Sequence, residues 1–318
     1  MEKGVETKRV WLFVAFAFGI AWTIDLVIYL TGGLSNLGVG SLAWVLLAVS
    51  MAAPSLANIL TRLVTGEGWR DLYLRPRFKR SWRFWATAWL GTPLLVLLGA
   101  GLFYALFPQY LDTTLSSAQA LLDQAAKSAG RPVPFGPMVF VVVQIVQTIV
   151  TGPLVIGPAT FGEEFGWRAY LLPKLMPLGG RKAALLVGVI WGVWHWPIIA
   201  MGYNYGLDYP GAPWVGLLAM TWSMVVTGVF LAWLLLKAKS VWPAVIGHAA
   251  FNSWAAIGTL LSQGQPCPLL GPTAAGLIGS LPFALLALWL LWRSSTLGEH
   301  QVSTQQPSSA AMPVPHRA

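Results

Sequence analysis

Eight apolar runs, each close to the length of one membrane span, dominate this chain of 318 residues. A helix needs about 20 predominantly apolar residues to cross the hydrocarbon core of a bilayer. Only 10% of the residues are charged, whereas soluble domains carry about 25%. The sequence therefore predicts an all-α fold, a polytopic membrane helical bundle of about eight transmembrane helices. The runs lie at about 10–31, 42–61, 85–107, 137–157, 183–200, 214–236, 241–261 and 272–292.

The basic residues predict the orientation of this bundle. With the N-terminus inside, every Lys and Arg except Lys127 and Arg131 falls on the cytoplasmic side, as the positive-inside rule requires. Both termini are then cytoplasmic. The net charge of +9 indicates contact with the lipid bilayer and does not indicate nucleic acid as a partner. The first run is too long for the apolar region of a cleaved signal peptide, so we interpret it as the first span.

Four regions follow from these runs. They are residues 1–134, with three spans; 135–262, with the polar groups described below; 263–293, with the last span; and 294–318, a tail. The tail is rich in Ser, Gln, Pro and Ala, so we expect it to be disordered and cytoplasmic. Residues 66–84 interleave aromatic and basic side chains and should lie on the inner leaflet. Residues 112–128 should form an amphipathic helix on the outer side.

A pair of adjacent acidic residues, Glu163 and Glu164, follows the fourth run. Charged side chains near hydrocarbon cost a few kcal/mol or more, so they are usually functional or tightly paired. On a helix, Glu164 and Arg168 are four residues apart and can form an ion pair. Glu163 points about 100° away and remains available for chemistry. Thr160 and Glu163 also have the spacing of a capping box, so simple anchoring of a helix end is an alternative at this point.

The fifth and seventh runs each carry one histidine, His195 and His248. Asn252 lies four residues after His248, so these two side chains share a helix face. Histidines inside membranes normally face the bundle interior or a water-filled cavity. Counted from the cytoplasmic ends of their spans, both lie in the inner half or near the midplane. We therefore expect them to meet Glu163 in one polar site.

A straight fourth span would carry Glu163 beyond the hydrocarbon. Gly152-Pro153 and Gly157-Pro158 can kink or break that helix, and this is the one broken span that the sequence indicates. Three more polar residues, Asp25, Gln144 and Gln147, lie in the outer halves of their spans. We interpret them as helix–helix contacts and not as part of the site.

Three motifs resemble those of the CAAX-protease and bacteriocin-processing (CPBP, or Abi) family of intramembrane endopeptidases. In order they are Glu163-Glu164-x-x-x-Arg168, Trp191-x-x-x-His195 and His248-x-x-x-Asn252. The resemblance covers residues 135–262 and identifies them as a CPBP/Abi-like catalytic core. The second motif usually begins with Phe. The larger ring of Trp191 can reshape the pocket but removes no reacting group.

The resemblance implies a multi-pass protease of a bacterial or archaeal plasma membrane. Its substrate would be a membrane-embedded or membrane-proximal peptide or protein, and a prenylated CAAX-type C-terminus is one option. The sequence indicates no particular oligomeric state.

Chemistry built from the residues agrees with this. Glu163 can serve as the general base for water, and His195 can orient that water or share its proton. His248 and Asn252 can donate hydrogen bonds to the oxyanion, while Glu164 and Arg168 support the helix end. The same Glu163, His195 and His248 could instead bind Zn²⁺ with one open position. We favour glutamate-activated water and keep zinc as the alternative.

Two other functions compete with a protease. A proton-coupled transporter would also carry buried Glu and His residues, but it predicts inverted repeats or paired broken helices. A non-proteolytic immunity or regulatory protein could use the same scaffold. The presence of Glu163, His195, His248 and Asn252 together favours catalysis, because such a protein would not need all four.

Overall fold

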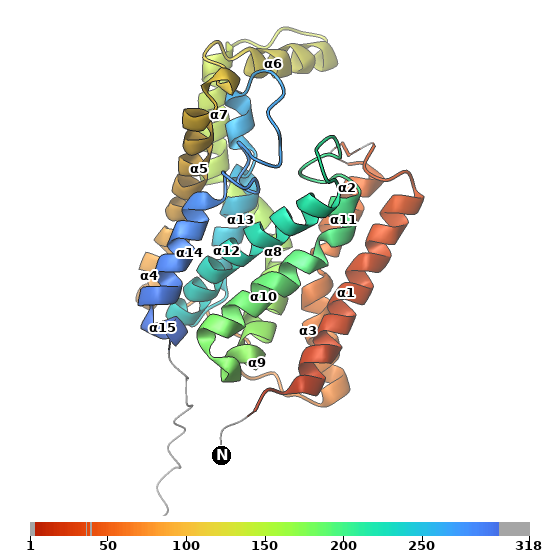
Figure 1. Cartoon of the computed structure of the whole chain (residues 1–318), viewed down its shortest axis with the longest axis vertical. Helices are drawn as coiled ribbons and strands as arrows, with labels where there is room; N and C mark the ends of the chain where they lie inside the picture. The colour runs from red at the N-terminus through yellow and green to blue at the C-terminus, as the bar shows by residue number, and fades with distance from the viewer. Residues whose placement is uncertain (1–3, 36, 39, 299–318) are drawn as a thin grey trace, which may run out of the picture.

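The computed structural model describes residues 4–298 apart from 36 and 39, and this part of the chain is an elongated helical bundle (Figure 1). The described residues contain no β-strand, and one isolated bridge pairs Leu111 with Ser262. The prediction of an all-α fold is confirmed. The helices are α1 (Thr7–Leu30), α2 (Leu42–Ser50), α3 (Ala53–Thr65), α4 (Phe78–Ala86), α5 (Thr92–Leu106), α6 (Ser116–Ala129), α7 (Pro137–Val150), α8 (Gly152–Gly166), α9 (Leu172–Leu175), α10 (Gly180–Trp194), α11 (Trp196–Ala200), α12 (Trp214–Ala238), α13 (Trp242–Trp254), α14 (Leu281–Arg293) and α15 (Ser295–Gly298).

Several of these helices are long and apolar enough to cross a membrane. Within the described residues, α1, the continuous helix Phe78–Leu106, α12 and the segment Trp242–Leu261 each qualify alone. Two bent pairs, α2 with α3 and α7 with α8, raise the number to six. The remaining two predicted spans contain α10 and α14, which have only 15 and 13 residues. The chain is an integral membrane protein, and the number eight stays a prediction.

Both bent pairs break beside a proline. The fourth span bends by 49° between α7 and α8, at Gly152-Pro153, whereas Pro158 lies inside α8 without ending it. The second span also bends, by 42°, just before Pro54. Proline lacks an N–H and is suited to the first turn of a helix, so a new helix begins there. The expectation of a single broken span is therefore wrong.

The last predicted span, 272–292, is wrong at its start. α14 begins only at Leu281, and the preceding apolar residues fold back on themselves. The amides of Leu277 and Ile278 bond the carbonyls of Leu269 and Leu270, and a Cβ on Gly276 would lie 2.7 Å from the Leu270 carbonyl oxygen. Apolar composition alone does not distinguish such a compact turn from a helix.

The predicted disordered tail is also corrected at its beginning, because α15 occupies Ser295–Gly298. Its remainder, residues 299–318, lies outside the described residues.

Helix α12 forms the centre of the bundle. Of the residues in its 18-residue apolar stretch, 72% are buried, compared with 28% in the corresponding stretch of α1. Gly188 and Gly192 bring α10 against it, since a Cβ on Gly192 would lie 2.5 Å from the Cα of Thr221. Small residues at such crossings are typical of membrane helices.

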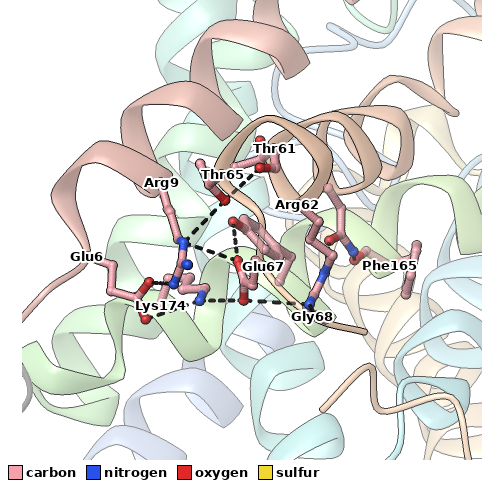
Figure 2. A network of polar contacts seen from close by, with 11 residues as sticks. Glu6, Arg9, Thr61, Arg62, Thr65, Glu67, Gly68, Phe165 and Lys174 are labelled. Carbon is pink, nitrogen blue, oxygen red and sulfur yellow. Dashed lines mark hydrogen bonds and ion pairs between the residues drawn. The ribbon is translucent and has the colours of Figure 1, made fainter. Parts of the chain in front are cut away.

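A polar network, which we call the basic-end clamp, ties together the end of the bundle that holds the start of α1 (Figure 2). Glu67 accepts hydrogen bonds from Lys174 Nζ (2.6 Å) and Tyr170 Oη (3.1 Å). Its carboxylate also lies 3.5 Å from nitrogens of Arg9 and Arg62. The clamp therefore joins α1 and α3 to the segment that follows α8. Its members are Glu6, Arg9, Arg62, Glu67, Tyr170 and Lys174.

The opposite end of the bundle carries α6 (Figure 1), which confirms the helix predicted within residues 112–128. Asp112 precedes it and accepts bonds from the hydroxyls of Thr114 and Ser116 and the amide of Ser117. These hydrogen bonds favour the ionised carboxylate and hold the pKa of Asp112 well below its usual range. The bond from Thr114 makes the largest contribution. Tyr104 Oη donates to the Gly258 carbonyl (2.8 Å), so the end of α5 is tied to the segment after α13.

Candidate active site

The acidic pair lies on the part of α8 that packs most closely against its neighbours. Glycines flank the pair: a Cβ on Gly162 would lie 2.5 Å from the Met51 carbonyl oxygen, and one on Gly166 would lie 2.4 Å from Pro54. The break between α2 and α3 therefore rests directly on α8. Glu163 and Glu164 are 2% and 0% exposed, so both carboxylates need partners inside the protein.

Glu164 has two such partners, which bond the same oxygen. Its Oε1 accepts a hydrogen bond from Arg168 Nη1 at 2.8 Å, as the spacing of four residues predicts. The same oxygen lies 2.9 Å from His248 Nδ1 on α13. Both Glu164 and Arg168 are fully buried. The predicted ion pair is confirmed, and it also positions a histidine.

The capping-box alternative is wrong. Thr160 lies well inside α8, which begins at Gly152. Its hydroxyl donates to the carbonyl of Val245 on α13 (3.1 Å). Thr160 therefore joins two helices and does not cap one.

Trp191 on α10 connects the remaining polar groups. Its indole Nε1–H donates to Glu163 Oε2 at 2.6 Å, and its carbonyl oxygen lies 2.8 Å from His195 Nδ1. Its ring centroid lies 4.0 Å from Arg168 Cζ and 5.1 Å from the centre of the His248 ring. Trp191 therefore contacts the predicted base, both histidines and the arginine.

The hydrogen bond of Trp191 was not predicted from the sequence. The sequence does contain an indication of this bond, because Trp191 stands where the resembling family usually has Phe. Of these two residues, only Trp carries an N–H that can bond a carboxylate.

One cavity of about 500 Å³ brings the four predicted site residues together. Glu163, His195, His248 and Asn252 all line it. Its walls also include Leu37, Asn204 and Thr273, from the connections that precede α2, follow α11 and precede α14. The cavity thus extends away from the basic-end clamp.

Asp25 also lines this cavity and is 5% exposed. Its interpretation as a helix–helix contact outside the site is therefore wrong. Counting residues along α1 gives a depth, but it does not show how far the cavity extends. The lining does not include Gln144 or Gln147.

The residues named for zinc do not assemble into a metal site. Among the described residues, no group of three or more His, Cys, Asp and Glu side chains is placed to hold a metal ion. Glu163, His195 and His248 line one cavity, but their arrangement does not fit the compact His₂Glu set that catalytic zinc requires.

Known proteins resemble this chain in the region around the site. Residues 136–254 match the family described as type II CAAX prenyl endopeptidase Rce1-like. CAAX prenyl protease 2 of Methanococcus maripaludis is 35% identical over 97 residues, which are 30% of this chain and 35% of that protein. The match thus spans about a third of this curated relative. The family match includes all three motifs, so the resemblance seen in the sequence is confirmed.

Proposed function

We propose that this protein is an intramembrane endopeptidase, because residues 136–254 match the family of type II CAAX prenyl endopeptidases described as Rce1-like. One observation carries the proposal: Glu163, His195, His248 and Asn252 line a single cavity inside a membrane bundle. Hydrolysis of a peptide bond needs a base, an oxyanion stabiliser and a proton for the leaving amine. These four side chains can supply all three.

Glu163 is the general base in this proposal. Trp191 bonds its Oε2, so Oε1 is available to take a proton from water. His195 donates its Nδ1–H to the Trp191 carbonyl, because a carbonyl oxygen can only accept. Neutral His195 then presents Nε2 as an acceptor that orients the same water. The hydroxide attacks the peptide carbonyl, and Glu163 afterwards gives the proton to the leaving nitrogen.

Asn252 and His248 stabilise the oxyanion. The side-chain amide of Asn252 donates directly. His248 Nδ1 bonds Glu164 Oε1, so His248 donates from Nε2 when it is protonated, and the carboxylate of Glu164 stabilises the imidazolium. Arg168 then offsets the charge of Glu164 when His248 is neutral. Glu164 and Arg168 are positioning residues in this scheme.

The orientation of the bundle decides which substrates can enter. With the N-terminus in the cytoplasm, as the positive-inside rule predicts, the basic-end clamp is cytoplasmic and the far-end connections of the cavity are external. A membrane-embedded peptide segment in the outer half of the bilayer is then the favoured substrate. A prenylated C-terminus is the second candidate, because the matched family is named for that class.

The test uses the purified full-length protein in detergent. It is incubated with a library of apolar peptides and, separately, with prenylated peptides, each with and without a chelator. We expect cleavage by the wild type, none by Glu163→Gln, and no effect of the chelator. Loss of cleavage on chelation, with recovery on adding Zn²⁺, would contradict the metal-independent mechanism.

A proton-coupled transporter is the second candidate, because the described residues include two broken spans, α2–α3 and α7–α8, that contact each other. Paired broken helices are typical of transporters. Proton flux in liposomes that is lost in Glu163→Gln, without peptide cleavage by the wild type, would favour this function.

A further inference from the structure

The side chains that line the cavity include acidic groups but no Lys or Arg among the described residues. Its ionisable side chains are Asp25, Glu163, the two histidines and Tyr203. Glu163 has a role in the proposed reaction, but Asp25 has none. The cavity therefore contains a second carboxylate and no fixed cation to balance it.

Asp25 lines the same cavity as the catalytic groups. It follows Trp22 by three residues on α1, which is about 4.5 Å along the helix axis. Trp22 Nε1 donates to the carbonyl of Trp194 at 3.1 Å, and Trp194 directly precedes His195. Position 25 of α1 is thus about one helical turn beyond Trp22, the residue through which α1 contacts the backbone next to His195.

The carboxylate of Asp25 is buried without a protein partner. The side chain forms neither a hydrogen bond nor an ion pair within the described part of the chain, although 5% of its surface is exposed and it lines the cavity. A carboxylate that only joins two helices would bond the second helix. Ionising an unpaired carboxyl group inside a membrane protein is costly, and a cation that enters the cavity would reduce this cost.

We propose that Asp25 forms a specificity subsite for a Lys or Arg side chain of the substrate, near the scissile bond. An extended peptide advances about 3.3 Å per residue, so the basic residue lies within a few positions of the cleaved bond. The indole of Trp44, which also lines the cavity, can cover the aliphatic part of that side chain. The inference rests on the proposed peptidase function and adds the class of substrate.

The test compares two peptides that differ only in charge. One carries Lys at the scanned position, and the other carries norleucine, which has a similar length but no ammonium. We measure kcat/KM for both peptides with the wild type, with Asp25→Asn and with a matched control, Asp208→Asn, which makes the same change on an exposed loop residue. Melting temperatures show that each variant is folded.

We expect the wild type and Asp208→Asn to prefer the Lys peptide by at least about tenfold, which is typical of a hydrogen bond to a charged group. Asp25→Asn should reduce this ratio to about twofold or less. Asp25→Lys should instead prefer a peptide with Glu at the same position. An equal Lys preference in the wild type and Asp25→Asn, or no preference at any scanned position in the wild type, would overturn the inference.

A binding measurement separates this inference from the peptidase proposal. Affinities of the same two peptides are measured for Glu163→Gln, with and without Asp25→Asn, from the fluorescence of the cavity tryptophans. Tighter binding of the Lys peptide that depends on Asp25 supports the subsite even if no peptide is cleaved. Equal binding of the two peptides by Glu163→Gln contradicts it, whether or not the wild type cleaves.

Discussion

His248 Nδ1 lies 2.9 Å from Glu164 Oε1, so a residue of α13 is held by a residue 84 positions earlier in the chain. The same oxygen accepts the bond from Arg168. Glu164 therefore links the buried arginine to a proposed oxyanion donor. Support of the helix end alone does not require a histidine, so we expect Glu164 to affect catalysis as well as stability.

The first prediction concerns Glu164→Gln, which keeps the volume but removes the charge. Breaking a buried ion pair by changing one partner typically costs about 3–5 kcal/mol, so the melting temperature should fall. The kcat of the folded protein should fall by at least about tenfold, because His248 loses the group that orients it. Glu67→Gln, in the basic-end clamp, is the matched control and should lower stability without lowering kcat. An unchanged kcat in Glu164→Gln would leave Glu164 with a structural role only.

The second prediction concerns Arg168. Arg168→Ala removes the ion-pair partner of the buried Glu164 and should destabilise the protein by about 3–5 kcal/mol. Arg168→Lys should recover only part of this loss, because an ammonium does not replace a planar guanidinium that lies 4.0 Å from the Trp191 ring centroid. Denaturant unfolding of the two variants measures both effects. Wild-type stability in Arg168→Ala would show that the pair contributes nothing.

The third prediction concerns Trp191→Phe, which restores the residue usual in the resembling family. The carboxylate of Glu163 loses a hydrogen bond that favours its ionised form. The acid limb of the pH–rate profile should therefore move upward by about one unit. Trp194→Phe is the control, since its indole bonds the Ala17 carbonyl and not Glu163, and it should leave that limb in place. An unmoved limb in Trp191→Phe would show that the bond does not tune the base.

The fourth prediction concerns orientation. Reporter fusions after Lys79 and after Lys239 should both be cytoplasmic, and a fusion after Lys127 should be external, as the distribution of Lys and Arg predicts. An external signal after Lys239 would show that the bundle has the opposite orientation. The cavity would then extend toward the cytoplasm, and a prenylated substrate would become the favoured one.

Local spacing explains what the sequence could predict about this site. The bond between Glu164 and Arg168 follows from their separation of four residues on a helix, and the different environment of Glu163 follows from the helical turn. The bend at Gly152-Pro153 follows from the geometry of proline. The gathering of Glu163, His195, His248 and Asn252 was predicted because polar residues inside membranes face the interior.

The remaining features depend on packing between distant segments. The contact of His248 with Glu164 and that of Trp191 with Glu163 join different helices, and no local pattern encodes their distances. The place of Asp25 in the cavity depends on how α1 lies against the end of α10. The compact turn before α14 has the composition of a span, and only its backbone hydrogen bonds distinguish it from a helix.

The most direct test of the central claim is the turnover of one cleaved peptide by Glu163→Gln, with folding checked by the melting temperature. Because this change removes only the proton acceptor, the protein should fold and kcat should fall by about 10²–10⁴-fold. Adding His195→Ala should cost little more, since groups that act as one unit are not additive. Full turnover by a folded Glu163→Gln would contradict the proposed mechanism.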